Sequence, residues 1–279
     1  MMIRRLVVVM LMTIVLVDVV RVEDVKEVVV KSAKELKSIK SNQIIWQKDG
    51  AKMVRIPEKF EVVPSQTEPI VYDEFGDLIE AETVIPEKMA KVGDAFFMDA
   101  FEVTVGQFKK FLKSSGYKPA EPIDWNKVYK YSPTDKHPMI YVTWHDATAY
   151  AKWVGKRLPT EKEWEYAARG GLIKKEYVWG DDEAVARDYA NYDGTGGKDK
   201  REYCAPVGSF KLNGYGLYDM AGNVWEWCQD WYDSNKTRRV LRGGSWNDPS
   251  SNLRVANRFG YFPSNTYYYV GFRCVVSDF

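Results

Sequence analysis

The most constraining feature of this sequence is a change at Gly171 from helix-forming segments to short apolar runs. Before it, helix-start signals and glycine stop signals delimit three amphipathic segments, at 104–116, 143–155 and 160–170. After it, the chain holds only short apolar runs between segments rich in Gly, Asn and Asp. Helices early in the chain and irregular strands late in it predict an α+β domain with two main helices, short strands and many loops. Loops longer than a compact domain requires usually carry a function.

Apolar runs upstream of the first helix predict strands. Residues 53–57 are expected to form a strand, and residues 60–64 resemble its hairpin partner. The polar and acidic residues between 65 and 91 predict a loop. Residues 95–103 again have the pattern of a strand.

The first fifty residues predict an appendage. Two arginines precede an apolar run at 6–17, which is too short to span a bilayer as a helix. Its length and basic flank are typical of a signal-peptide core, whereas its Val and Ile content also fits a buried strand. Export or membrane association therefore stands beside a cytoplasmic location. Helical spacing within 32–41 predicts a stalk, so we expect an appendage at 1–50 and a domain at 51–279.

The composition narrows the classes of function. The 40 basic and 39 acidic residues leave a formal charge of +1, which gives no electrostatic footprint for nucleic acid. Three cysteines allow at most one disulfide bridge, and their spacing matches no zinc-binding pattern. Ten Trp and 18 Tyr favour either long loops pinned by large side chains or a recognition surface. Few glutamines beside abundant Lys and Glu indicate a thermophilic source.

Four motifs follow one another from residue 155 onward. Residues 155–169 read GKRLPTEKEWEYAAR, and residues 213–227 read NGYGLYDMAGNVWEW. Residues 242–246 (RGGSW) and 271–273 (GFR) complete the set. In this order they resemble the signature of the formylglycine-generating-enzyme (sulfatase-modifying-factor) family, over about residues 53–277. The resemblance implies the C-type-lectin-like fold of that family.

The resemblance implies one of three functional kinds. This chain lacks the metal-binding residues that two of them require. The oxidase kind uses two copper-binding cysteines, at positions where this chain has Asp248 and Leu253. Cu(I) requires soft thiolate ligands, and Cys274 stands where the cysteine of the family is structural. The iron-dependent kind uses three histidines, but this chain has only His137 and His145. We therefore expect no copper, no iron and no catalysis.

The third kind uses its last loops for binding, as in the variable proteins of diversity-generating retroelements. Residues 241–273 are similar to such variable regions, and we expect the variable part at 246–270. Framework residues alternate there with residue types that adenine changes in an Asn codon produce. The expected ligand-binding residues are Asn247, Asp248, Ser250, Ser251, Phe259, Gly260, Tyr261, Phe262, Ser264, Asn265, Thr266, Tyr267, Tyr268 and Tyr269.

The aromatic residues of this segment favour a binding surface on physical grounds. Three consecutive tyrosines, at 267–269, cannot all point into one core, so at least one should face solvent. Tyr combined with Ser, Gly and Asn is the composition of an antibody paratope. The alternative is that the aromatic rings pack under the loops. We predict a non-catalytic protein that binds a protein or cell-surface ligand; an enzyme with unfamiliar chemistry and an undiversified assembly module are the alternatives.

The resemblance also implies calcium in a structural role. Its ligands would be side-chain and main-chain oxygens, which are the hard donors that Ca²⁺ prefers. The expected ligands are Asp219, Gly222, Val224 and Glu226 at one site, and Asn191 and Asp199 at another. The alternative is that the carboxylates at 219 and 226 only accept backbone hydrogen bonds in a tight turn.

Overall fold

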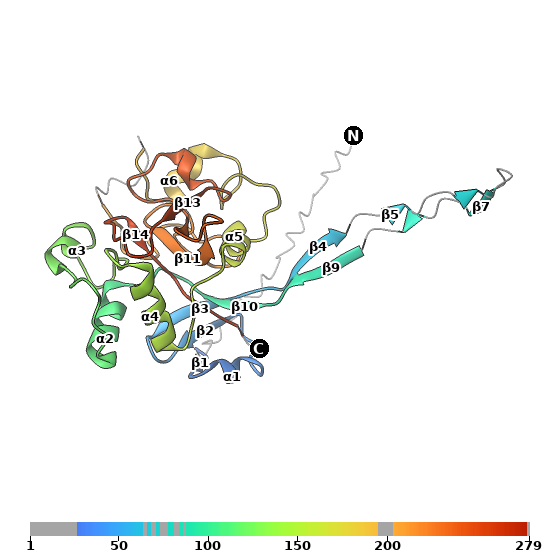
Figure 1. Cartoon of the computed structure of the whole chain (residues 1–279). Coiled ribbons are helices and arrows are strands. Elements are labelled where there is room, and N and C mark those ends of the chain that lie inside the picture. Colours follow the sequence, from blue (N-terminus) through green and yellow to red (C-terminus); the bar gives the residue numbers. More distant parts are fainter. Residues whose placement is uncertain are drawn as a thin grey trace, which may run out of the picture.

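The computed structural model describes residues 27–63, 66–67, 71–72, 78–80, 84–85, 88–194 and 203–277, with side chains outside 60–92. It has the predicted α+β architecture, in which two larger sheets, three two-stranded pairs and several helices are joined by loops (Figure 1). The position expected for a calcium ligand at Asp199 lies outside the described residues.

A five-stranded sheet joins the beginning and the end of the domain. Its order is β1-β2-β3-β10-β15, so the C-terminal strand lies at the edge opposite the first strands. The strands are β1 (Val29–Val30), β2 (Gln43–Trp46), β3 (Ala51–Ile56), β10 (Phe96–Asp99) and β15 (Val275–Ser277). Strand β10 pairs antiparallel with both β3 and β15, so it joins the N-terminal strands to the C-terminal one.

Alternation along the central strands gives the sheet two apolar faces. Met53 and Phe97 belong to a core that also contains buried residues of α2 and α4. Val54 and Phe96, their neighbours in the sequence, belong to a second core that includes Trp164 of α5. Both faces are therefore covered, and apart from Asp99 the buried residues of β3 and β10 are apolar.

The three predicted helices are confirmed. Thr104, Thr143 and Thr160 each form a capping box, and a left-handed glycine follows each helix as its C-cap. The helix α3, capped by Asp124, was not predicted. The helices are α1 (Ala33–Leu36), α2 (Val105–Ser115), α3 (Trp125–Tyr131), α4 (Trp144–Val154), α5 (Glu161–Arg169) and α6 (Ala186–Tyr189), with the 3₁₀ turns η1 (Glu183–Val185) and η2 (Ser250–Leu253).

A second sheet carries the C-terminal motifs. Its order is β13-β12-β11-β14, and only the β11–β14 pair is parallel. The strands are β11 (Trp225–Trp231), β12 (Arg239–Arg242), β13 (Arg258–Tyr261) and β14 (Val270–Gly271). The expected variable segment therefore begins after β12, runs through β13 and ends at β14.

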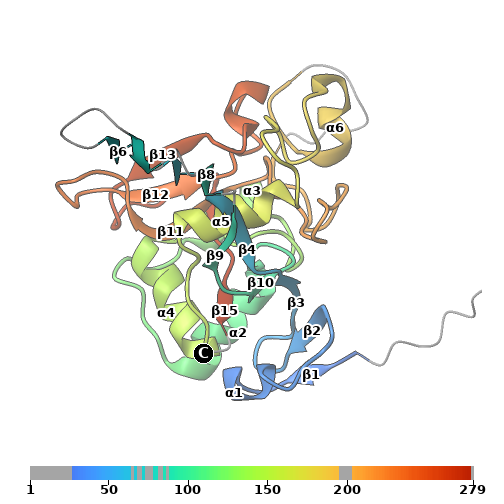
Figure 2. The ribbon, with the colours of Figure 1, turned by 90° about the vertical axis from the view of Figure 1, so that its right-hand side faces the viewer.

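The hairpin expected between 53–57 and 60–64 is wrong. Both edges of β3 are already occupied by β2 and β10, so the next strand pairs elsewhere. Strand β4 (Lys59–Val63) pairs with β9 (Lys88–Gly93). The predicted acidic loop instead contributes short pairs, β5 (Gln66–Thr67) with β8 (Val84–Ile85) and β6 (Val71–Tyr72) with β7 (Leu78–Glu80). These pairs form a ribbon that projects from the domain in Figure 1 and points toward the viewer in Figure 2.

The residues expected to form a stalk belong to the folded domain. Leu36, Ile44 and Trp46 are buried in the core, and the indole of Trp46 donates to the carbonyl oxygen of Val154 at 2.7 Å. A boundary at residue 50 would separate β2 from β3, with which it pairs. The stalk pattern arose because α1 is polar on its outer side.

The expected membrane association is corrected for the described part of the chain. No helix in the described ranges is both long enough and apolar enough to cross a membrane. The apolar run at 6–17, on which that expectation depended, lies outside the described residues.

Candidate ligand-binding surface

A buried ion pair at the centre of the domain joins three of the four motifs. Arg273 donates from Nε and Nη2 to the carboxylate of Glu226, with distances of 2.8 to 3.0 Å. Trp164 donates its indole hydrogen to the same carboxylate at 2.7 Å. All three side chains are buried, and the Glu226 carboxylate accepts hydrogen bonds from the other two. These motif residues therefore hold α5, β11 and the C-terminal segment together.

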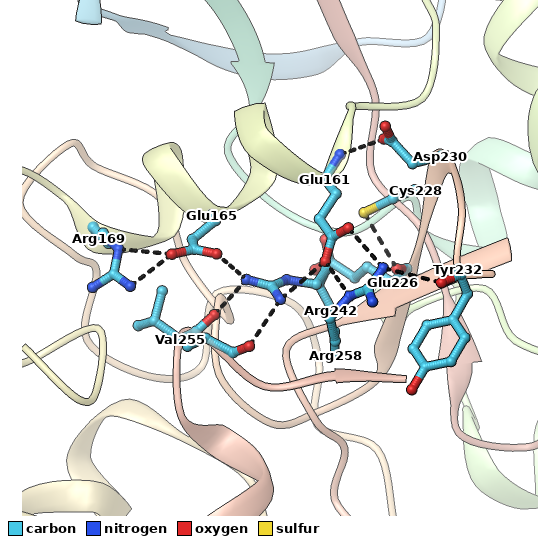
Figure 3. Close-up of polar contacts among 11 residues, drawn as sticks. Glu161, Glu165, Arg169, Glu226, Cys228, Asp230, Tyr232, Arg242, Val255 and Arg258 are labelled. Carbon is cyan, nitrogen blue, oxygen red and sulfur yellow. Dashed lines mark hydrogen bonds and ion pairs between the residues drawn. The ribbon is translucent and has the colours of Figure 1, made fainter. Parts of the chain in front are cut away.

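A second network ties α5 to the segment that leads into β13 (Figure 3). Arg242, buried on β12, lies 2.7 Å from the carboxylate of Glu165 and 3.3 Å from that of Glu161. It also donates to the carbonyl oxygen of Val255 at 2.6 Å. Glu161 pairs in turn with Arg258, the first residue of β13, at 2.7 Å. The network fixes the backbone on which the expected ligand-binding residues stand.

The two positions of the oxidase cysteines are occupied by residues with structural contacts. The carboxylate of Asp248 accepts hydrogen bonds from Trp225 Nε1 at 2.8 Å, from Ser245 Oγ, and from Asn252 Nδ2 at 2.6 Å. Leu253 is buried in the core. Asp248 therefore caps the turn that follows β12, and neither position offers a thiolate to copper.

All three cysteines are free and buried. Burial raises the pKa of Cys204 to about 12 and raises the pKa of Cys228 and Cys274 well above the ordinary range. Thiols are nucleophilic only as thiolates, so these three should be inert in the folded protein.

We expect that none of these thiols reacts rapidly with Ellman's reagent at pH 8 in the native protein. In 6 M guanidinium chloride all three should react. A thiol that reacts rapidly under native conditions would contradict this expectation and would identify a cysteine available for chemistry.

Aromatic rings gather where the expected variable segment folds back on itself. Tyr261 stacks on Tyr267, with 4.1 Å between ring centroids, and the hydroxyls of Tyr261 and Tyr269 are hydrogen-bonded at 2.6 Å. Phe259 lies 5.0 Å from Tyr261 and 6.1 Å from Trp225. The indole of Trp225 binds Asp248, so this cluster links the two groups of expected ligand-binding residues.

Three further aromatic residues join the cluster. Trp246 lies within the expected variable segment but was not named as a ligand-binding residue, and Tyr131 and Tyr203 lie outside that segment. Tyr268 stacks on Tyr131 of α3, with centroids 4.9 Å apart, and Trp246 lies 5.7 Å from Tyr268. Tyr203 meets Tyr131 edge to face at 4.9 Å. We call the set the aromatic surface; it consists of Tyr131, Tyr203, Trp246, Phe259, Tyr261, Tyr267, Tyr268 and Tyr269. Because α3 itself was not recognised in the sequence, no local pattern indicated that Tyr131 would belong to it.

The three consecutive tyrosines are neither fully exposed nor packed entirely under the loops. Tyr267, Tyr268 and Tyr269 are all half-buried, because each stacks on a neighbouring ring while part of its side chain stays accessible. Packing of this kind makes the surface rigid, which lowers the entropy lost on binding.

The expected ligand-binding residues differ in accessibility. Phe259 and Phe262 are 48% and 54% exposed, which is unusual for such large apolar side chains. Gly260 is buried, and a side chain at its position would collide with Tyr232. The other exposed members are Asn247, Ser251, Ser264 and Thr266, and the half-buried ones are Asp248, Ser250, Asn265 and the tyrosines at 261 and 267–269. Gly260 thus serves the packing of β13, whereas Phe259, Tyr261 and the tyrosines at 267–269 belong to the aromatic surface itself.

The residues expected to bind calcium are only partly arranged for it. The buried carboxylate of Asp219 accepts from the Gly208 amide at 2.6 Å, and its other oxygen has no partner among the described residues. The side-chain oxygen of Asn191 is likewise buried without a described partner. Glu226, in contrast, already binds Arg273 and Trp164 with both oxygens. Across the described ranges, no three His, Cys, Asp or Glu side chains converge as a metal cluster.

The sequence model of the sulfatase-modifying factor enzyme 1-like domain matches residues 46–278. The chain belongs to this family. A formylglycine-generating enzyme of Streptomyces coelicolor is 43% identical over 163 residues, which cover 50% of this chain and 52% of the relative. This chain thus aligns with about half the length of that enzyme. The inactive formylglycine-generating enzyme 2 of Bos taurus is 34% identical over 229 residues, covering 64% of this chain and 76% of the relative.

A solved structure supports the family fold. Variable protein 1 of Treponema denticola has a TM-score of 0.57 and is 23% identical, covering 81% of this chain and 94% of that structure. The predicted C-type-lectin-like fold of the formylglycine-generating-enzyme type is therefore confirmed. The family contains both named enzymes and a named inactive member, so membership by itself does not establish the activity of this chain.

Proposed function

We propose that this family member is a non-catalytic binding protein whose recognition site is the aromatic surface. The proposal depends on one observation at the turn that would carry the first oxidase cysteine. That position holds Asp248, whose carboxylate accepts hydrogen bonds from three donors. One of them is Trp225, which packs against the exposed Phe259. Rigid aromatic area bordered by Asn, Ser and Thr side chains is suited to a protein or cell-surface ligand. The two exposed phenylalanines, Phe259 and Phe262, would be anchors of the contact.

The same proposal includes diversification of residues 246–270 by a retroelement. The sheet supports this reading, because β12 and the buried Gly260 fix the backbone while the side chains of Phe259 and Phe262 are exposed. The test is to sequence the gene and its neighbourhood in several isolates. Variation confined to 246–270, beside a reverse transcriptase and a near-copy of this segment, is the expected result. An invariant segment without such a copy would exclude diversification.

We also propose that calcium has a structural role at the turn that contains Asp219. The fit is favourable at Asp219 and Asn191, whose buried oxygens have no described partner, and unfavourable at Glu226, whose carboxylate is held by Arg273. When bound, the ion would supply positive charge to buried oxygens and would pin the surrounding loops.

Calcium is therefore expected to raise the melting temperature. An excess of about 100-fold over Kd corresponds to about 2.7 kcal/mol, or roughly 5–10 °C for a chain of this size. Scanning calorimetry in calcium and in EGTA measures the difference, with Asp219→Asn as the variant in which it should disappear. Equal melting temperatures for the wild type in both buffers would contradict the proposal.

A further inference from the structure

A groove lies between the five-stranded sheet and the turn that follows residue 213. It has a volume of about 340 Å³ and is lined by Asn42, Gln43, Arg55, Pro57, Gly214 and Tyr215. None of these residues belongs to the aromatic surface. The volume lies at the lower end of the range for small-molecule sites, about 300–1,000 Å³.

The sequence and the sheet bring the lining together from distant parts of the chain. The backbone amide of Arg55 on β3 donates to the carbonyl oxygen of Asn42 at 2.8 Å. This hydrogen bond places the two residues side by side at the open end of the β2–β3 hairpin. Tyr215 is positioned by its own amide, which donates to Asn213 Oδ1 at 3.0 Å, and by its hydroxyl, 3.4 Å from that of Tyr166. The walls of the groove are therefore anchored on both sides.

Three polar side chains that line the groove have no partner among the residues that the structure describes. In the described part of the chain, the guanidinium of Arg55 has no ion pair, and the side-chain amides of Asn42 and Gln43 have no hydrogen bond. No Asp or Glu lines the groove. A guanidinium without an acid beside two amides is a donor-rich site that is complementary to a carboxylate.

We propose that this groove binds a small organic acid. Its carboxylate would pair with the Arg55 guanidinium, and the amides of Asn42 and Gln43 would donate to the remaining lone pairs of the same two oxygens. The rings of Pro57 and Tyr215 would contact the hydrocarbon part. Planar, two-point pairing favours a carboxylate that presents both oxygens to Arg55.

The proposal is tested by calorimetric titration of the intact protein with acetate, succinate, glutarate, citrate and benzoate, and separately with inorganic phosphate. At least one carboxylate should bind, and Arg55→Gln should weaken that binding at least about tenfold, as expected for loss of a charged hydrogen bond. Arg254→Gln is the matched control, because Arg254 is an arginine outside the groove that pairs with Glu176. It should leave the affinity unchanged.

Folding of each variant is checked by thermal unfolding. Gln43→Ala removes an exposed donor and provides a second variant, with a smaller expected loss of affinity, should Arg55→Gln not fold. The proposal is overturned if no carboxylate of the panel binds, or if phosphate binds more tightly than every carboxylate. It is also overturned if the groove variants bind like the Arg254→Gln control.

Discussion

Replacement of Arg273 by methionine is expected to lower the free energy of unfolding by about 3–5 kcal/mol. The guanidinium is fully buried and donates to Glu226 and to the carbonyl oxygens of Asp99, Ala100 and Tyr218. Methionine fills similar space but leaves the Glu226 carboxylate desolvated and without its ion pair, and Trp164 is then its remaining donor among the described residues. Urea unfolding monitored by tryptophan fluorescence measures the change.

The matched control is Arg254→Met. Arg254 also pairs with an acid, Glu176, but both side chains are about half exposed. An exposed pair contributes about 0–1 kcal/mol, so this variant should unfold nearly as the wild type does. Equal losses in the two variants would show that the buried pair has no special role in holding the motifs together.

Replacement of Gly222 by alanine is expected to cost about 2–5 kcal/mol. A Cβ at this position would lie 2.1 Å from the carbonyl oxygen of Asn191, and the backbone has a φ of +75°. The left-handed conformation contributes about 1–2 kcal/mol, and displacement of the neighbouring backbone contributes about 1–3 kcal/mol more. The close approach cannot relax cheaply, because the amide of Asn223 also donates to this carbonyl oxygen at 2.8 Å.

Gly50→Ala separates the two contributions. Gly50 has nearly the same φ, +76°, but a Cβ there would meet nothing within 4 Å. We expect it to lose only the conformational part, about 1–2 kcal/mol. Chemical unfolding of both variants gives the difference. If Gly50→Ala is as destabilised as Gly222→Ala, the contact with Asn191 does not limit residue choice at 222.

Local signals predicted the helices well because their determinants are close in the sequence. Each capping box joins a threonine to a residue three positions later, and each glycine stop lies at the end of the same segment. Strand pairing was predicted less well. Residues 60–64 resembled a hairpin partner for 53–57 by proximity alone, but β3 takes its partners from β2 and from the distant β10.

The candidate site was also predicted only where its residues are close together in the sequence. Its C-terminal half was predicted because 259–269 are rich in Tyr, Phe, Ser and Asn within one segment. Tyr131 and Tyr203 were not predicted. Their contacts with Tyr268 and Trp246 depend on how α3 and the segment that contains residue 203 pack against the C-terminal loops. For calcium, the sequence indicated Glu226 as a ligand, whereas the structure commits its carboxylate to Arg273.

The sequence by itself determined the family, the fold class, the limits of α2, α4 and α5, and the absence of the oxidase cysteines, since each depends on residue identities at short, fixed spacings. The tertiary structure decided which rings meet at the aromatic surface and which carboxylates are already paired. It also decided which groups, such as the Arg55 guanidinium, lack a partner in the described chain. Those properties depend on distances between residues far apart in the chain, and side-chain pairing in space leaves no periodic trace in the sequence.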